Sequence, residues 1–206
     1  MQVTREIFSF SKKNTQVYIT PNCIDLTTDV ASIQLLDDEK EKYVALKSDK
    51  RKKEFLLVRF LRNNFFPGKE ILYNSSGAPY FKDKSYAISI SHTSAFISLA
   101  ATQEERIGID IELIQEKIIP LGQKFMHLNE ISTITSSNQT IQYTKFWCAK
   151  EALFKWTSIT GLSFQNDLSV LQDKNNHWFG ISNRISQKLI SLEIVEFNDH
   201  VLCFTY

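Results

Sequence analysis

The chain has 206 residues, of which 43% are hydrophobic and 23% are charged, and its formal net charge is +1. These values are ordinary for a globular protein, and a charge so close to zero argues against a protein whose main partner is long nucleic acid. No apolar run reaches the ~18–20 residues that span a bilayer, and the first residues lack a signal-peptide apolar region. We therefore expect a cytoplasmic protein that binds neither membranes nor nucleic acid.

The first half of the chain predicts a helix followed by two paired strands. The expected elements are a strand over 16–20, a helix over 37–66 that ends before the breaker pair Pro67-Gly68, and strands over 86–91 and 95–101. Between 40 and 62 this helix carries nine Lys or Arg against three acidic residues, a local balance of +6. A solvated helix face is the ordinary explanation. A single-strand nucleic-acid surface is disfavoured, because stacking aromatic residues are not interleaved with the charges.

The second half repeats this order of helix and paired strands. The expected elements are a strand over 106–112, helices over 122–132 and 140–158, and strands over 189–197 and 201–206. Sequence identity between the two halves is negligible, so the repeat is a weak signal by itself.

The three cysteines, Cys23, Cys148 and Cys203, are widely spaced and form no Cys-x-x-Cys pair. This spacing indicates reduced thiols rather than a zinc site or a disulfide framework. Cys148 stands between Trp147 and Ala149 in a helical segment, where we expect a small packing residue and not a nucleophile.

The segment Gly108-Ile109-Asp110-Ile111-Glu112 places two carboxylates on one face of an apolar strand. Side chains alternate across a strand, so Asp110 and Glu112 share a face with Gly108, while the isoleucines face a packed interior. Two carboxylates this close repel each other unless a cation or a shared proton relieves the repulsion. Their hard oxygens suit Mg²⁺, which takes few protein ligands together with a substrate phosphate. The alternative is an edge strand whose polar face meets water.

The segment 145–156 predicts a helix that presents an acid and a base together. Trp147, Glu151 and Lys155 are spaced i, i+4, i+8 and so lie on one stripe. An exposed ion pair is the alternative, and it contributes only about 0.2–0.5 kcal/mol to a helix. The four aromatic residues between 146 and 156 indicate a largely buried helix. The acid and the base are therefore expected in the wall of a cleft.

Together these two segments resemble the paired motifs of the phosphopantetheinyl transferases. Three further segments resemble the larger, single-chain, surfactin-synthetase-activating branch of that family. They are Asn74-Ser-Ser-Gly77-Ala-Pro79-Tyr, similar to its Gly-Lys-Pro loop, Ile88-Ser-Ile-Ser91-His92-Thr93, similar to its Asn-x-Ser-His-Ser strand, and Lys124-Phe125-Met126 with Glu130, similar to its Arg-Phe-Phe-x-x-x-Glu element. The motifs follow the family order and, with the basic helix, cover about residues 40 to 170.

The resemblance implies the 4′-phosphopantetheinyl transferase fold, an α+β fold of two similar halves related by a pseudo-twofold axis. We expect an N-terminal half over 1–104 with the basic helix and the His92 strand, which binds coenzyme A. A C-terminal half over 105–206 would carry the magnesium and catalytic motifs. Because one chain supplies both halves, we expect a monomer.

The resemblance also implies the reaction, in which the 4′-phosphopantetheine arm of coenzyme A moves to a serine of an apo acyl or peptidyl carrier protein. Such carriers serve fatty-acid, polyketide or nonribosomal peptide synthesis, and adenosine 3′,5′-bisphosphate is released. Asp110, Glu112 and Glu151 are the expected Mg²⁺ ligands, Glu151 is also the expected general base, and Lys155 is the expected catalytic cation on the pyrophosphate. The expected contacts to coenzyme A are Lys52, Lys53, Arg62, Ser91, His92 and Lys155.

One residue departs from the family pattern. Ala78 stands where the Gly-Lys-Pro loop carries a lysine, so we expect an altered grip on coenzyme A, with Asn74 or Lys82 as replacements. Phe125 and Met126 are expected either to contact the carrier protein or to belong to the core. Two rival functions remain at this point: a Mg²⁺-dependent nuclease, and an inactive module that binds coenzyme A or a carrier.

Overall fold

The computed structural model describes residues 5–27, 29–135 and 137–206. The strands are β1 (Phe8–Lys12), β2 (Thr15–Pro21), β3 (Ile71–Tyr73), β4 (Pro79–Phe81), β5 (Ala87–His92), β6 (Phe96–Thr102), β7 (Ile109–Leu113), β8 (Leu168–Gln172), β9 (Trp178–Ser182), β10 (Ser186–Phe197) and β11 (His200–Thr205). The helices are α1 (Asp37–Ala45), α2 (Asp49–Phe65), α3 (Gly122–Phe125), α4 (Leu128–Ile131) and α5 (Gln139–Thr157), with short 3₁₀ turns η1 (Val30–Ser32) and η2 (Glu116–Leu121).

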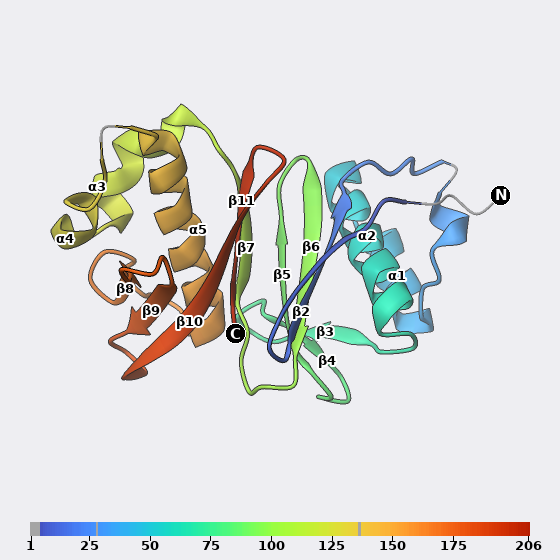
Figure 1. Ribbon diagram of the computed structural model, residues 1–206. Coiled ribbons are helices and arrows are strands. Elements are labelled where there is room, and N and C mark those ends of the chain that lie inside the picture. Colours follow the sequence, from blue (N-terminus) through green and yellow to red (C-terminus); the bar gives the residue numbers. More distant parts are fainter. Residues whose placement is uncertain (1–4, 28, 136) are drawn as a thin grey trace.

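The strands form two antiparallel sheets, each built from one half of the chain. The first sheet has the order β1-β2-β6-β5, and the second has the order β7-β11-β10-β9-β8. A separate small hairpin joins β3 to β4. Figure 1 shows the two sheets side by side in the centre of the molecule, where β7 of the second sheet lies beside β5 of the first.

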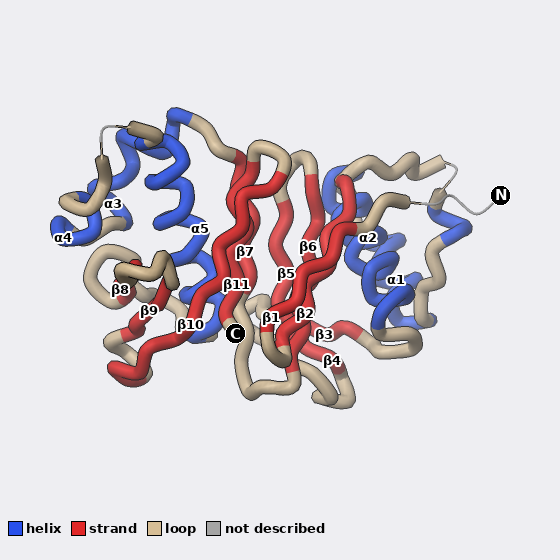
Figure 2. Tube along the Cα trace, viewed as in Figure 1, coloured by secondary structure: helices blue, strands red, loops and turns tan. Residues whose placement is uncertain are grey.

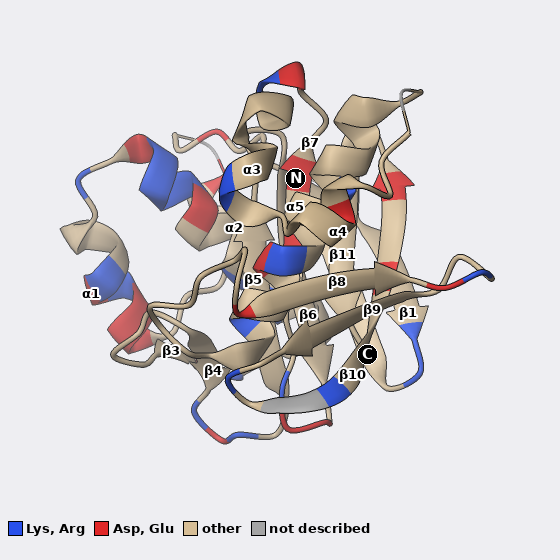
Figure 3. Ribbon diagram, turned by 90° about the vertical axis from the view of Figure 1, so that its left-hand side faces the viewer, with Lys and Arg blue, Asp and Glu red and all other residues tan. Residues whose placement is uncertain are grey.

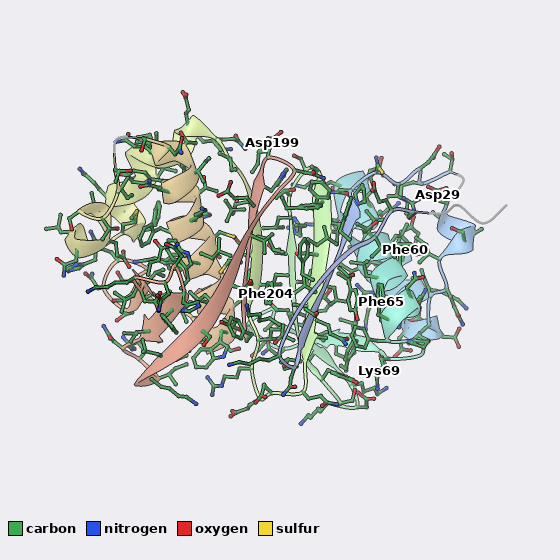
Figure 4. The ribbon with its side chains drawn as sticks, in the orientation of Figure 1. Asp29, Phe60, Phe65, Lys69, Asp199 and Phe204 are labelled. Atoms are coloured by element: carbon green, nitrogen blue, oxygen red, sulfur yellow. The ribbon has the colours of Figure 1, made fainter. Side chains whose placement is uncertain are left out.

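The helices cover the outer faces of the two sheets, as Figure 2 shows. One apolar core lies between α2 and the first sheet, and another lies between α5 and the second sheet. A third core lies between the sheets and includes Phe204, which is labelled in Figure 4. Ile109 and Ile111 of β7 belong to this central core, so the packed interior expected behind the acidic strand is confirmed.

The helix expected over 37–66 is two helices, because the chain breaks at residues 46–48. The buried Glu39 carboxylate of α1 pairs with Arg59 and Arg62 of α2. In one straight helix residues 39 and 59 would stand about 30 Å apart, so this contact requires α1 to fold back beside α2. The next helix starts at Asp49 directly after Ser48, a residue type that favours helix starts.

The element expected over 122–132 is likewise two one-turn helices, α3 and α4. The strands β1, β3, β4, β8 and β9 were not expected from the sequence, and all are short. A strand of three to five residues gives too little alternation to stand out, and these strands form because a neighbouring strand pairs with them. The other expected strands lie within a few residues of their observed bounds.

The α+β class is confirmed, and each half combines a long helix with an antiparallel sheet. All strands of the first sheet precede residue 104 and all strands of the second follow residue 105, although the division into two domains at that point stays a prediction. Among the described residues no helix has both the length and the apolar character needed to cross a membrane.

Candidate active site

The polar face of β7 meets one stripe of α5. The indole Nε1 of Trp147 donates a hydrogen bond of 2.8 Å to Glu112 Oε1, and Lys155 Nζ donates one of 2.8 Å to Asp110 Oδ1. The helix therefore runs antiparallel to the strand, with Glu151 in the middle of the stripe. The two faces deduced from the sequence are confirmed and lie against each other.

The glycine of the acidic motif permits this close contact. A Cβ added to Gly108 would stand 1.8 Å from the carbonyl oxygen of Ala152 and 2.8 Å from the backbone nitrogen of Trp156. Only a residue without a side chain lets the α5 backbone approach β7 this closely. The same approach allows the Lys155 ammonium to donate a second hydrogen bond, of 2.9 Å, to the Ile109 carbonyl oxygen.

Burial and neighbouring negative charges raise the pKa of two carboxylates of the site, Glu112 and Glu151. Burial, then the charges of Asp110 and Glu112 raise the pKa of Glu151 to about 7, against the opposing charge of Lys155. Burial and the Asp110 charge also raise the pKa of Glu112, while the Trp147 hydrogen bond and Lys155 oppose that rise. A bound cation would relieve the repulsion that raises the pKa of Glu112 and Glu151, so the site favours a cation.

These residues fit a magnesium ion. The Oδ2 atom of Asp110 is buried and accepts no hydrogen bond from the described residues, so one carboxylate oxygen is free for a ligand. Within the described part of the chain no group of three His, Cys, Asp or Glu side chains is placed to hold a metal ion, so Asp110, Glu112 and Glu151 do not come together as the expected three ligands. Mg²⁺ does not require three such ligands, because it keeps several waters and binds through one or two carboxylates plus substrate phosphates.

Two neighbours fix Asp110 in place. Ser91 Oγ donates a hydrogen bond of 2.7 Å to Asp110 Oδ1, and the buried Cys148 thiol donates one of 3.2 Å to the Asp110 carbonyl oxygen. Ser91 was expected as a contact to coenzyme A, and the contact that the structure gives it is to this acid from the neighbouring sheet. Cys148 is buried in the core, as expected of a packing residue, and burial raises its pKa.

The basic run of α2 reaches the site through its first turn, the blue band at the start of that helix in Figure 3. His92, at the end of β5, has its Nδ1 atom 3.4 Å from Glu54 Oε1, and Arg51 Nη1 donates a hydrogen bond of 3.1 Å to Glu54 Oε2. Burial lowers the pKa of His92, Glu54 opposes this, and Arg51, Lys50 and Lys155 lower it further. The charges that act on the His92 ring therefore come from both α2 and Lys155 of α5.

The expected basic residues are not the ones that gather at His92. Lys52 Nζ lies 5.8 Å from the centre of the Tyr43 ring, and Lys53 is half-buried on a different side of α2 from Glu54. Arg62 is a correction: its side chain is 1% exposed, and its guanidinium donates to Glu39 at 2.8 Å and to the Lys69 carbonyl oxygen at 2.5 Å. Its place in the buried interior, set by a partner 23 residues earlier, keeps it from coenzyme A.

A cleft of about 640 Å³ opens between the two halves next to Lys155, and Asp110, Glu112 and Glu151 do not line it. Its lining includes the Gly77-Ala78-Pro79 loop, the β5 strand, the connection over 103–107 and Lys155. Of the two replacements expected for the missing loop lysine, Asn74 lines the cleft and Lys82 does not. Asn74 Oδ1 accepts three hydrogen bonds within its own turn, and Lys82 pairs with Glu70.

Lys150, the residue before Glu151, belongs to the buried interior and holds α5 in place. Lys150 is fully buried, 2.7 Å from Glu130 Oε2, and donates to the carbonyl oxygens of Phe164 and Leu168. Glu130 of the third motif is thereby an anchor for α5 rather than a surface acid. Phe125 and Met126 were expected either to belong to the core or to contact the carrier protein. Both side chains are buried in the core, so the first prediction is confirmed and the second is wrong.

Sequence comparison relates this site to a known family. Residues 106–205 match the family described as the 4′-phosphopantetheinyl transferase superfamily. Over 94 residues the chain is 34% identical to the 4′-phosphopantetheinyl transferase gsp of Aneurinibacillus migulanus. The aligned region covers 43% of this chain and 39% of that protein. The chain thus spans about two fifths of the length of the curated relative that it matches.

Two solved structures are similar to about half of the chain. One is a holo-(acyl-carrier-protein) synthase from Bacillus anthracis in complex with CoA (3′,5′-ADP), with 21% identity and a TM-score of 0.42 over 48% of this chain and 92% of that one. The other is the Helicobacter pylori holo-[acyl-carrier-protein] synthase in complex with coenzyme A, with 18% identity and a TM-score of 0.41 over 48% of this chain and 96% of that one.

The family match spans both acidic motifs, from Asp110 and Glu112 to Glu151 and Lys155. With the likeness to gsp it confirms the resemblance seen in the motifs. Residues 106–205, just under half of the chain, are thus similar to the 4′-phosphopantetheinyl transferase superfamily.

Proposed function

We propose that this protein transfers the 4′-phosphopantetheine arm of coenzyme A to a serine hydroxyl of an apo acyl or peptidyl carrier protein. The observation that carries the proposal is the group of Asp110, Glu112 and Glu151 beside Lys155, a residue that also lines a cleft of about 640 Å³. That volume is within the ~300–1,000 Å³ range of small-molecule sites. The family match supports the same reaction.

Asp110 and Glu112 are the proposed holders of Mg²⁺, with Glu151 as the third acid. When bound, the ion would supply charge neutralisation on the pyrophosphate of coenzyme A. Ser91 and Lys155 orient Asp110 through its Oδ1 atom, which leaves Oδ2 for the ligand. Trp147 fixes the direction of the Glu112 carboxylate in the same way.

Glu151 is the proposed general base. In the reaction the serine oxygen bonds to the phosphorus that carries the pantetheine arm, and the bond from this phosphorus to the adenosine bisphosphate breaks. The serine proton passes to the Glu151 carboxylate. A pKa of about 7 suits this role, because a base is most effective when its pKa lies near the working pH. Lys155, which lines the cleft, stabilises the charge of the leaving group.

His92 is the proposed contact of the coenzyme A phosphates among the expected basic groups. Lys52 and Lys53 stay predictions as further contacts, because they do not gather at His92 as Lys50 and Arg51 do. The two halves divide the work, since residues 1–104 supply these basic groups and residues 105–206 supply the acids. A monomer is sufficient for this arrangement, and the cytoplasm is the proposed compartment.

An intact-mass measurement tests the reaction. The purified protein is incubated with coenzyme A, Mg²⁺ and several apo carrier proteins, and a mass gain of one phosphopantetheine arm on a carrier is expected. Binding of coenzyme A without any mass gain would leave the inactive module as the function. Absence of both binding and transfer would exclude the proposal and favour a test for nuclease activity.

A further inference from the structure

A buried carboxylate lies beneath the basic surface next to the active site. The Glu54 side chain is 7% exposed and stands within 4 Å of three basic groups: Arg51 at 3.1 Å, His92 at 3.4 Å and Lys50 at 3.9 Å. Lys50 and Arg51 come from the preceding turn of α2, and His92 comes from β5. We name these four residues the Glu54 cluster.

The basic side chains of the Glu54 cluster are more exposed to solvent than the acid that they contact. The side chains of Lys50 and Arg51 are 72% and 66% exposed, and that of His92 is 36% exposed, while the acid beneath them is nearly covered. Surface lysines and arginines ordinarily lose much rotamer freedom when they bind a ligand. Here one fixed acid, buried under them, limits the positions that the basic groups take.

The acid also has an unused hydrogen-bonding atom. Glu54 Oε1 is buried and accepts no hydrogen bond from the described residues, although His92 Nδ1 is 3.4 Å away. A buried acceptor without a donor is costly, and a protonated imidazole supplies the donor. An anion on the solvent side of His92 favours that protonated form, so the ligand and Glu54 would act on the imidazole together.

We propose that Glu54 is a positioning residue whose buried carboxylate gathers these three basic side chains into a cradle for the 3′-phosphate monoester of coenzyme A. The inference rests on the proposed function, because it takes coenzyme A as the ligand. A phosphate monoester presents three oxygens, and arginine and protonated histidine meet these through charge-assisted hydrogen bonds. Glu54 itself does not touch the ligand.

The negative charge of Glu54 makes the direction of the change in phosphate affinity a test of the proposal. Removing a negative charge near a phosphate site should strengthen phosphate binding if charge alone decides the affinity. If Glu54 acts by positioning, its removal should weaken binding, because Arg51 and Lys50 must then be ordered by the ligand and His92 loses its partner. Glu54→Gln keeps the side-chain shape and separates these two possibilities.

The test compares coenzyme A with 3′-dephospho-coenzyme A, which lacks the phosphate in question, by titration calorimetry of the full chain. Glu54→Gln should weaken coenzyme A binding about tenfold, the loss of one charge-assisted contact, and change dephospho-coenzyme A binding by less than about twofold. In steady-state transfer assays the KM for coenzyme A should rise while kcat stays near that of the wild type. Tighter or unchanged coenzyme A binding, or equal weakening for both ligands, would overturn the proposal.

Matched variants exclude a general structural effect. Glu70→Gln removes the acid of another Lys–Glu pair, that with Lys82, and should leave both affinities unchanged. If Glu54→Gln fails to fold, Arg51→Ala gives the test at an exposed position, with Lys82→Ala as its control. By NMR, Glu54→Gln should also lower the pKa of His92, since Glu54 is the group that raises it. A wild-type protein that binds neither ligand would refute the proposed function as well, whereas a wild type that transfers while its variants bind normally would refute only this inference.

Discussion

The β7 backbone at Gly108 lies against the α5 backbone at Ala152 so closely that a Cβ on Gly108 would stand 1.8 Å from the Ala152 carbonyl oxygen. This contact joins the two acidic motifs. It brings the strand that carries Asp110 within reach of Lys155, and it sets the spacing between two acids on β7 and one on α5. The geometry of the candidate active site therefore depends on a glycine that has no proposed role in the reaction.

Gly108→Ala should push α5 away from β7. The added methyl meets backbone atoms, which do not move as a side-chain end would, so the loss of stability should reach or exceed the ~1–3 kcal/mol of an overpacked core. Transfer activity should fall further than coenzyme A binding. Thermal unfolding and calorimetry measure both effects. Gly161→Ala is the control, since a Cβ there has open space and only a left-handed backbone to contend with; equal activity loss in both variants would contradict this role for Gly108.

Glu151→Gln should lower kcat by roughly 10²–10⁴-fold, the usual contribution of a general base, with little change in the affinity for coenzyme A. The acid limb of the wild-type rate profile should lie at or below about pH 7, because a bound cation lowers the pKa of Glu151 from its cation-free value. Rates at saturating carrier protein between pH 5 and about 9 measure this limb. Glu196→Gln, at an exposed pair with Lys145, is the control. A parallel loss of affinity and turnover would remove Glu151 from the role of base.

The same variant should stabilise the protein above neutral pH when Mg²⁺ is chelated. The pKa of Glu151 is raised from 4.5 to about 7 in the folded state, so the folded chain retains a proton that the unfolded chain has lost. The stability linked to this proton is complete below pH 4.5 and is lost as the pH rises through about 7. At pH ~8 Glu151→Gln should gain up to about 3 kcal/mol over the wild type, and near pH 4 the gain should vanish. A gain that did not depend on pH would point to packing instead.

Asp110→Ala should abolish Mg²⁺-dependent transfer, because it removes the buried oxygen that no described residue uses and the acceptor of the Lys155 hydrogen bond. Mg²⁺ should raise the unfolding temperature of the wild type, since it relieves repulsion among the acids, and should not raise that of the variant. Asp173→Ala, on an exposed turn, should respond to Mg²⁺ as the wild type does. Unchanged activity of Asp110→Ala at saturating Mg²⁺ would exclude this acid from the metal site.

Lys150→Ala should act on stability, although Lys150 is the neighbour of Glu151, the proposed general base. It leaves Glu130 buried without its cation, a change that typically costs about 3–5 kcal/mol. Replacing both partners with apolar residues, as Lys150→Met with Glu130→Leu, should cost less than Lys150→Ala alone. Denaturant unfolding measures the difference. If the double variant were the less stable of the two, the attraction within the Lys150–Glu130 ion pair would exceed the free-energy cost of burying the two charges.

Much of the candidate site could be predicted because its parts are periodic. The alternation of Gly108, Asp110 and Glu112 and the four-residue spacing of Trp147, Glu151 and Lys155 each define a face within one element. Local geometry fixes such faces wherever the element packs. The family motifs added the pairing of the two faces, which spacing alone does not contain.

The sequence by itself therefore determined the α+β class, the acidic strand, the helix that carries Glu151 and Lys155, and the family that these segments resemble. Only the tertiary structure decided which charged residues are available to a ligand. Arg62 is buried in an ion pair with Glu39, and Lys150 is buried in an ion pair with Glu130, so neither can contact a ligand. At His92, the basic residue that shares the Glu54 carboxylate is Arg51 and not Lys53. The physical reason is that a charged residue looks the same in sequence whether it faces water or a partner far along the chain, and only packing supplies that partner.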